Sequence, residues 1–272
     1  MTRVLTFLAV LALAIYLFTF YLRRTGMFFP DTYPTGRWDL KAWMLEPSEH
    51  YFKTSDGVKL HGWLFKASNP EAPVIVWCHG NAGNLTDRAE MAAELAKRGV
   101  SVFLFDWRGY GRSEGEAREN ALFRDALAAH DYVRGLGAKR IVMYGESVGG
   151  PYAAYVAKER GDVSAVIIEN SFPSLREMGN ALYHPLPLGW AAPFALRTTK
   201  WLNDARVPVL VMHGTRDAVI PYSLGKKLYD GLDVPKEMLT SHAGHCEIPL
   251  FEAQRYYETV IRFTRKPVGS GR

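Results

Sequence analysis

The pattern G-x-S-x-G occurs twice in the chain, as Gly111-Arg-Ser-Glu-Gly115 and as Gly145-Glu-Ser-Val-Gly149. This pattern carries a serine nucleophile only where a strand runs into a sharp turn and then a helix, because that geometry lifts the hydroxyl above the sheet. An apolar run precedes Ser147 and small residues follow it. Ser113 follows a glycine-rich loop and precedes a polar stretch. The sequence therefore predicts Ser147, and not Ser113, as the nucleophile.

A serine hydroxyl becomes nucleophilic at neutral pH only when a base takes its proton, and a carboxylate must orient that base. Asp217 lies in the loop after one predicted strand, and His245 lies in the loop after the next. Loops at the carboxyl ends of parallel strands meet at one edge of the sheet. We therefore expect Ser147, Asp217 and His245 to form a catalytic triad for acyl transfer.

Two rivals compete for these roles. His242 lies three residues before His245, but His245 lies deeper in the loop and follows Gly244, which permits a sharp turn. Glu169 is a second candidate acid, because it also ends a predicted strand between the nucleophile and the base.

Attack on an acyl carbon places negative charge on the carbonyl oxygen, and two backbone N–H groups can stabilise it there. Val148, the residue after the nucleophile, is expected to supply one donor. The other is expected from the loop that begins at His79, with Asn81 as the preferred donor and Ala82 as the reserve. His79 precedes Ser147 in the chain, and we expect it to be a structural residue of that loop.

The elements that must position these residues follow a regular order. Two strand-like runs flank the turn Ser55-Asp-Gly, and strands then alternate with helices. The predicted strands are 51–54, 59–65, 73–78, 100–105, 140–144, 163–168, 207–212 and 237–240, and the predicted helices are 85–98, 117–134, 148–160, 223–231 and 250–265. This order predicts an α/β fold with a mostly parallel sheet covered by helices on both faces.

The predicted catalytic domain spans 48–272. Within it, the stretch of about 171–205 is too long for an ordinary connection. Its Leu, Phe, Trp and Pro content predicts a small cap over the site.

Val4 to Leu22 forms a run of 19 uncharged residues, closed by Arg23 and Arg24. This is long enough to span a bilayer, and it lacks the short apolar region and small-residue exit of a cleaved signal peptide. The sequence predicts an uncleaved transmembrane signal anchor over 1–26 and a juxtamembrane linker over 27–47. The protein is thus expected at a membrane through a single N-terminal pass. Basic residues flank both ends of the run, so the side of the membrane stays open.

Composition limits the remaining possibilities. The chain has 272 residues, 48% of them hydrophobic, so it can bury one large core. Its net charge of +5 comes from 33 basic and 28 acidic residues without basic runs, which argues against nucleic acid as a partner. The two cysteines, Cys78 and Cys246, have no metal-ligand spacing and do not reveal a redox compartment.

Five motifs in succession resemble the α/β-hydrolase superfamily. They are His79-Gly-Asn-Ala-Gly-Asn, Asp106-Trp-Arg-Gly-Tyr-Gly-Arg-Ser-Glu-Gly, Gly145-Glu-Ser-Val-Gly-Gly, His213-Gly-Thr-Arg-Asp and Gly244-His245. More narrowly, the chain resembles membrane-anchored α/β-hydrolase-domain proteins, related to lysophospholipase-like and depalmitoylating enzymes, over 51–265. The resemblance implies an α/β-hydrolase fold that cleaves acyl esters or thioesters without a cofactor or metal.

The sequence departs from the family pattern at Glu146, where close relatives often carry Arg or His, and at Cys246 after the base. The elbow serine argues against epoxide hydrolases and dehalogenases, which need an aspartate there. A serine peptidase and a non-catalytic binding protein of the same fold remain as alternatives. The expected substrate is a small-molecule or lipid-like acyl ester, with chain length and oligomeric state left open.

Overall fold

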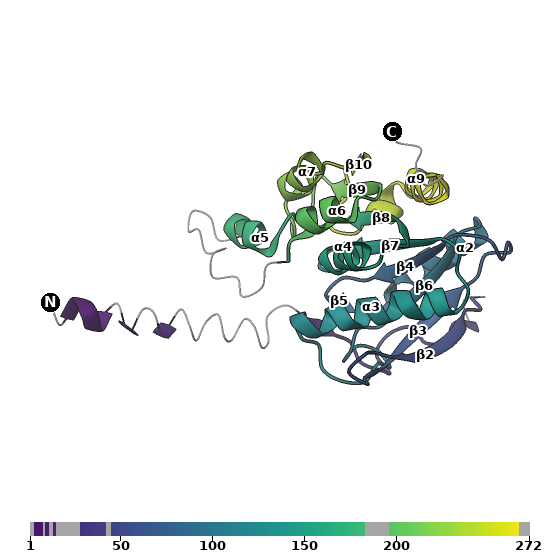
Figure 1. Ribbon diagram of the computed structural model, residues 1–272, viewed down its shortest axis with the longest axis horizontal. Helices are drawn as coiled ribbons and strands as arrows, with labels where there is room; N and C mark the ends of the chain where they lie inside the picture. Colours follow the sequence, from purple (N-terminus) through teal and green to yellow (C-terminus); the bar gives the residue numbers. More distant parts are fainter. Residues whose placement is uncertain are drawn as a thin grey trace.

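An eight-stranded sheet forms the centre of the protein (Figure 1). The computed structural model describes residues 3–7, 9–10, 13–14, 28–41, 45–182 and 196–266. The strand order is β10-β9-β8-β7-β4-β6-β3-β2. The strands are β2 (Ser48–Lys53), β3 (Lys59–Phe65), β4 (Val74–Cys78), β6 (Ser101–Phe105), β7 (Ile141–Glu146), β8 (Val163–Glu169), β9 (Val209–Gly214) and β10 (Lys236–Ser241). The six strands from β10 to β6 run parallel, and β3 and β2 complete the sheet as an antiparallel edge.

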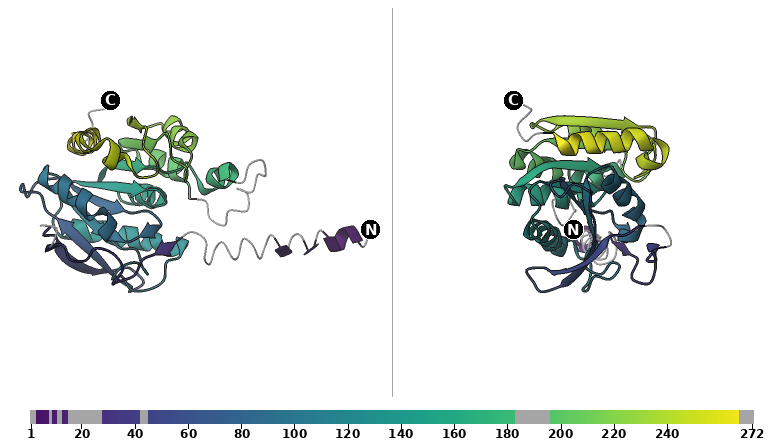
Figure 2. Two further views of the ribbon diagram at one scale, coloured as in Figure 1. Left: turned by 180° about the vertical axis from the view of Figure 1, so that it is seen from behind. Right: turned by 90° about the vertical axis from the view of Figure 1, so that its right-hand side faces the viewer.

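Helices cover both faces of the sheet (Figures 1 and 2). Side chains of α3 (Glu119–Gly135), α4 (Gly149–Glu159), α6 (Thr198–Ala205) and α7 (Tyr222–Asp230) share one buried apolar cluster. Side chains of α2 (Ala89–Lys97), α8 (Ile248–Phe251) and α9 (Ala253–Arg265) belong to the other. The parallel strands are buried on both faces, which is why they read as continuous apolar runs.

The predicted order of strands and helices is confirmed, including the antiparallel pair β2 and β3. Two helices differ from prediction. The first begins as a 3₁₀ turn, Leu85–Arg88, capped by the Asn84 side chain. The last is broken between α8 and α9 at Glu252, whose carboxylate accepts the Ser241 hydroxyl at 2.5 Å and ties this corner to the loop after β10.

The predicted linker, 27–47, differs from a plain connector where the structure describes it. Strand β1 (Phe29–Pro30) pairs in parallel with β5 (Ala82–Gly83). The side chain of Asn84 donates to the carbonyl oxygens of Asp31 and Thr35, at 3.1 and 2.8 Å. This stretch is therefore held against the loop after β4. The sequence did not predict this pairing, because a two-residue strand has no periodicity to detect.

The predicted cap, 171–205, contains α5 (Leu175–Leu182) and α6. Helix α6 is part of the layer that packs on the sheet, since Leu202 is fully buried in the same apolar cluster as α4. Helix α5 has no fully buried side chain, although Leu175 and Met178 are partly buried against the same cluster. Residues 183–195 lie outside the described residues, so the cap over the site stays a prediction.

Most of the predicted anchor, 1–26, also lies outside the described residues. In the described part of the chain, no helix is both long enough and apolar enough to cross a membrane.

Candidate active site

Ser147, His245 and Asp217 lie together at the carboxyl ends of β7, β10 and β9. Nε2 of His245 lies 3.0 Å from Oγ of Ser147, and Nδ1 lies 2.7 Å from Oδ2 of Asp217. When Nδ1–H donates to the carboxylate, the lone pair of Nε2 faces the hydroxyl and can accept its proton. The structure brings the three predicted residues together, and their catalytic roles stay a prediction.

The turn at Ser147 has the geometry of a nucleophile elbow. Ser147 has φ 53°, a left-handed conformation that non-glycine residues rarely adopt and that is concentrated at functional sites. Glycines allow helix α4 to begin in close contact with the sheet. A Cβ on Gly149 would lie 2.0 Å from the carbonyl oxygen of Cys78, so no larger residue fits there. A Cβ on Gly145 would lie 2.5 Å from Cα of Gly150. These contacts explain why small residues follow the serine.

The rival serine and histidine lie outside this arrangement. Ser113 donates its hydroxyl to the carbonyl oxygen of Asp106 at 2.7 Å and accepts the backbone N–H of His61 at 2.9 Å. It therefore braces a loop. The ring of His242 contacts the hydroxyl of Thr215, with Nδ1 3.2 Å from Oγ1, and is exposed.

Both oxygens of the Asp217 carboxylate are held in place. Oδ1 accepts the backbone N–H groups of Val219 and Ile220, each at 2.8 Å. Oδ2, the oxygen that faces His245, also accepts Nδ2 of Asn170 at 2.6 Å. The carboxylate cannot rotate without losing these bonds, so it can orient the imidazole.

The pKa values of the two candidate acids are shifted in opposite directions. Burial acts to raise the pKa of Asp217, but hydrogen bonds from His213, His245 and other donors outweigh it and hold that pKa far below its usual range. Burial raises the pKa of Glu169 to about 8, and the Glu169 side chain pairs with the Tyr144 hydroxyl. The ionised carboxylate beside His245 is thus that of Asp217.

The loop after β4 lies beside the nucleophile. A Cβ on Gly80 would be 3.5 Å from the Cβ of Ser147. Nδ1 of His79 lies 2.8 Å from the carbonyl oxygen of Gly80, a contact that fixes the peptide plane carrying the N–H of Asn81. Val148 occupies the N-cap position of α4, directly after Ser147. The two predicted oxyanion donors therefore lie in elements that flank Ser147, and their role stays a prediction.

Sequence reasoning missed two residues at the site. Asn170 directly follows Glu169, has φ 47° and donates to Asp217. An asparagine placed directly after a strand was the available signal, because asparagine tolerates this conformation. Arg88 binds the Glu146 carboxylate through Nε and Nη2. The unusual acid at position 146 indicated a buried partner, but not which one.

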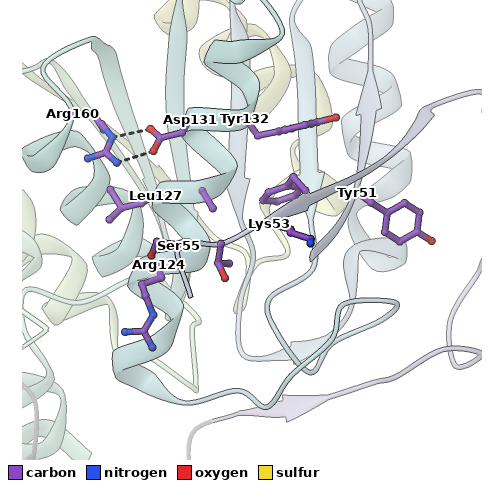
Figure 3. Close-up of a pocket in the computed structure, with 11 residues that line it drawn as sticks. Tyr51, Lys53, Ser55, Arg124, Leu127, Asp131, Tyr132 and Arg160 are labelled. Carbon is purple, nitrogen blue, oxygen red and sulfur yellow. Dashed lines mark hydrogen bonds and ion pairs between the residues drawn. The ribbon is translucent and has the colours of Figure 1, made fainter. Parts of the chain in front are cut away.

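A pocket of about 590 Å³ lies between β2 and α3 (Figure 3). Three of the four charged residues that line it, Arg124, Asp131 and Arg160, form ion pairs. Arg160 donates two bonds of 2.7 Å to Asp131, and Nε of Arg124 lies 3.0 Å from the Asp56 carboxylate. No triad residue lines it. We therefore place the candidate site at the triad.

Over the described ranges, no group of three or more His, Cys, Asp or Glu residues is arranged to hold a metal ion. The expectation of cofactor-free chemistry stays a prediction.

Comparison with known proteins decides the family. A family model described as alpha/beta hydrolase fold matches residues 73–195. The alpha/beta hydrolase domain-containing protein WAV2 of Arabidopsis thaliana is 31% identical over 241 residues, covering 79% of this chain and 78% of that one. The chain belongs to the α/β-hydrolase family. Another α/β-hydrolase, the lysophosphatidylserine lipase ABHD12 of Danio rerio, is 32% identical over 200 residues, which are 66% of this chain and 52% of the lipase.

A solved structure shows the same fold for this α/β-hydrolase. The Pyrococcus furiosus esterase Pf2001 superimposes with a TM-score of 0.71 at 21% identity, covering 89% of this chain and 100% of the esterase.

Proposed function

We propose that this protein is a serine hydrolase that cleaves acyl esters or thioesters through an acyl-enzyme intermediate. The observation that carries the proposal is the unbroken hydrogen-bonded chain from Ser147 through His245 to Asp217, starting on a strained elbow. The esterase and lipase names among its relatives support the bond type.

In the first half of the reaction, Oγ of Ser147 attacks the acyl carbon while Nε2 of His245 takes its proton. The backbone N–H groups of Asn81 and Val148 stabilise the oxygen that becomes negative. The imidazolium then returns its proton to the departing alcohol or thiol. In the second half, His245 activates a water molecule, which releases the acid and restores the serine.

We also propose that the protein is held at a membrane by 1–26 and acts on lipid-like substrates there. The backbone N–H of Phe29 donates to the carbonyl oxygen of Asn81 at 2.8 Å, so the chain enters the domain beside the oxyanion loop. Phe29 is 58% exposed, and Leu250 and Phe251, soon after His245 in the chain, are 80% and 70% exposed. Such side chains suit contact with an apolar phase.

The acyl chain then contributes binding free energy, at about 0.8 kcal/mol per buried methylene until its pocket is full. The test is kcat/KM of the full chain in detergent for esters from acetyl to palmitoyl. A rise over the first carbons followed by a plateau is expected. A steady fall beyond butyryl contradicts the lipid proposal and leaves the hydrolase proposal standing.

The hydrolase proposal itself is tested by covalent labelling with a fluorophosphonate, which Ser147→Ala should abolish. An unlabelled wild-type protein would contradict it. Faster cleavage of aminoacyl amides than of any ester would instead identify a peptidase.

A further inference from the structure

The two predicted oxyanion donors belong to separate elements. Asn81 lies in the loop after β4, whereas Val148 lies at the start of α4. An oxyanion hole works only when both N–H groups are held in advance at the position of the developing charge. The contact that ties the loop to the elbow therefore controls how well charge is stabilised.

One guanidinium makes that tie. Nε and Nη2 of Arg88 donate to the two carboxylate oxygens of Glu146, at 3.0 and 2.5 Å, and Glu146 directly precedes Ser147. Nη1 of Arg88 donates to the carbonyl oxygens of Ala82 and Asn84, at 3.2 and 3.4 Å. A bidentate pair is geometrically rigid. The same side chain thus binds the elbow and the loop after Asn81.

The surroundings of Glu146 strengthen this link. Nε1 of Trp77 donates to Oε2 of Glu146 at 3.1 Å. Burial acts to raise the pKa of Glu146, but the charge and hydrogen bonds of Arg88 outweigh it and hold the pKa at about 2. A Cβ on Gly80 would lie 3.0 Å from Oε1. The carboxylate is therefore ionised and in close contact with the loop.

We infer that Arg88 and Glu146 are positioning residues that hold the loop bearing Asn81 in register with the elbow bearing Ser147 and Val148. Neither side chain touches the reacting atoms in this scheme. A buried ion pair does not by itself indicate a contribution to stability, because apolar side chains can often replace such a pair without loss of stability. The best-attested role of a buried ion pair is to fix the register of the elements that it joins. The inference rests on the proposed function.

The experiment compares Arg88→Met with wild type and with Arg134→Met as a matched control. Arg134 also joins a carboxylate to loop carbonyls: it pairs with Asp162 and donates to the carbonyl oxygens of Ala138 and Lys139. It lies outside the triad and the oxyanion loop. Any loss of activity that both variants share is therefore due to the removal of an arginine that joins a carboxylate to loop carbonyls.

We expect Arg88→Met to lower kcat about 100-fold, as when an oxyanion donor is lost. The affinity for an alkyl boronic acid, which forms a tetrahedral adduct with the serine, should fall by the same factor. KM and the affinity for the product carboxylic acid should change less than about threefold. Arg88→Lys, which keeps the charge without the bidentate fork, should be intermediate. Arg134→Met should keep wild-type kcat and boronate affinity.

A merely structural role predicts a different result: boronate and product acid weaken together, or kcat stays within about threefold of wild type. Either overturns the inference. If Arg88→Met does not fold, Arg88→Lys and Glu146→Gln provide the same comparison. Fluorophosphonate labelling distinguishes a failure of the proposed function from a failure of the positioning role. An unlabelled wild type overturns the proposed function, whereas equal labelling rates for wild type and a folded Arg88 variant overturn only the positioning role.

Discussion

Asn170 and His245 bind the same oxygen of Asp217: Nδ2 of Asn170 lies 2.6 Å from Oδ2, and Nδ1 of His245 lies 2.7 Å from it. Asn170 is fully buried and adopts a left-handed backbone conformation with φ 47°. It thus provides both a turn after β8 and a donor that aligns the acid with the base.

Asn170→Gly separates these two contributions. Glycine adopts the same backbone angle without strain, so the variant should keep the turn and lose the hydrogen bond together with the packing of the buried amide side chain. We expect kcat to fall about tenfold, for the loss of a bond worth about 1.5 kcal/mol to a charged group. Asn170→Ala should lose the same activity and be less stable than Asn170→Gly in urea unfolding. Wild-type kcat in Asn170→Gly would contradict an aligning role.

The triad should behave as one unit. Ser147→Ala and His245→Ala should each lower kcat by several orders of magnitude with the fold retained, and the double variant should be little worse than either. Steady-state ester hydrolysis and circular dichroism measure both properties. Ser113→Ala is the control: it removes a loop brace, so it should be about 1 kcal/mol less stable yet keep near-normal kcat. Additive losses in the double variant would argue against a shared mechanism.

Asp217→Asn tests the choice of acid. The amide keeps the size of the side chain but loses the charge that stabilises the imidazolium and selects its tautomer. Activity should fall about 10⁴-fold, as expected for a triad acid. Glu169→Gln should retain most activity, because its side chain pairs with Tyr144. A more damaging effect of Glu169→Gln in the same ester assay would reverse the assignment.

Glu169 should also make stability depend on pH. Its pKa is raised to about 8 by burial, against an ordinary value of 4.5. Between these values the folded protein holds a proton that the unfolded chain has released. The free energy of unfolding should therefore fall as pH rises, by up to about 1.4 kcal/mol per pH unit.

Glu169→Gln cannot release this proton, so its stability should change less over that range. Urea unfolding of wild type and variant at about pH 5 and about pH 8 checks the difference. Parallel pH dependence in the two proteins would show that another group is responsible.

The sequence by itself determined the order of the strands and helices and the elbow at Ser147. Continuous apolar strands, helical periodicity and the glycines around the serine are local patterns, and each is set by residues within one turn or strand. The structure gives the physical reason for the glycines after the serine: a Cβ on Gly149 would meet the carbonyl oxygen of Cys78, and one on Gly150 would meet the side chain of Ser171.

The order of motifs favoured Asp217 and His245 over Glu169 and His242, but only the tertiary structure shows their side chains within hydrogen-bonding distance of one another and of Ser147. Glu169 also lies beside the serine, where its backbone carbonyl, and not its carboxylate, accepts the N–H of Ser147 at 2.8 Å. His245 and Ser147 are 98 positions apart, and Asn170 and Asp217 are 47 apart. Contacts of this kind depend on strand register and on the direction of each side chain at the sheet edge, which no local pattern encodes. The same holds for Arg88 and Glu146, 58 positions apart, because a buried carboxylate selects its partner by proximity in the folded chain.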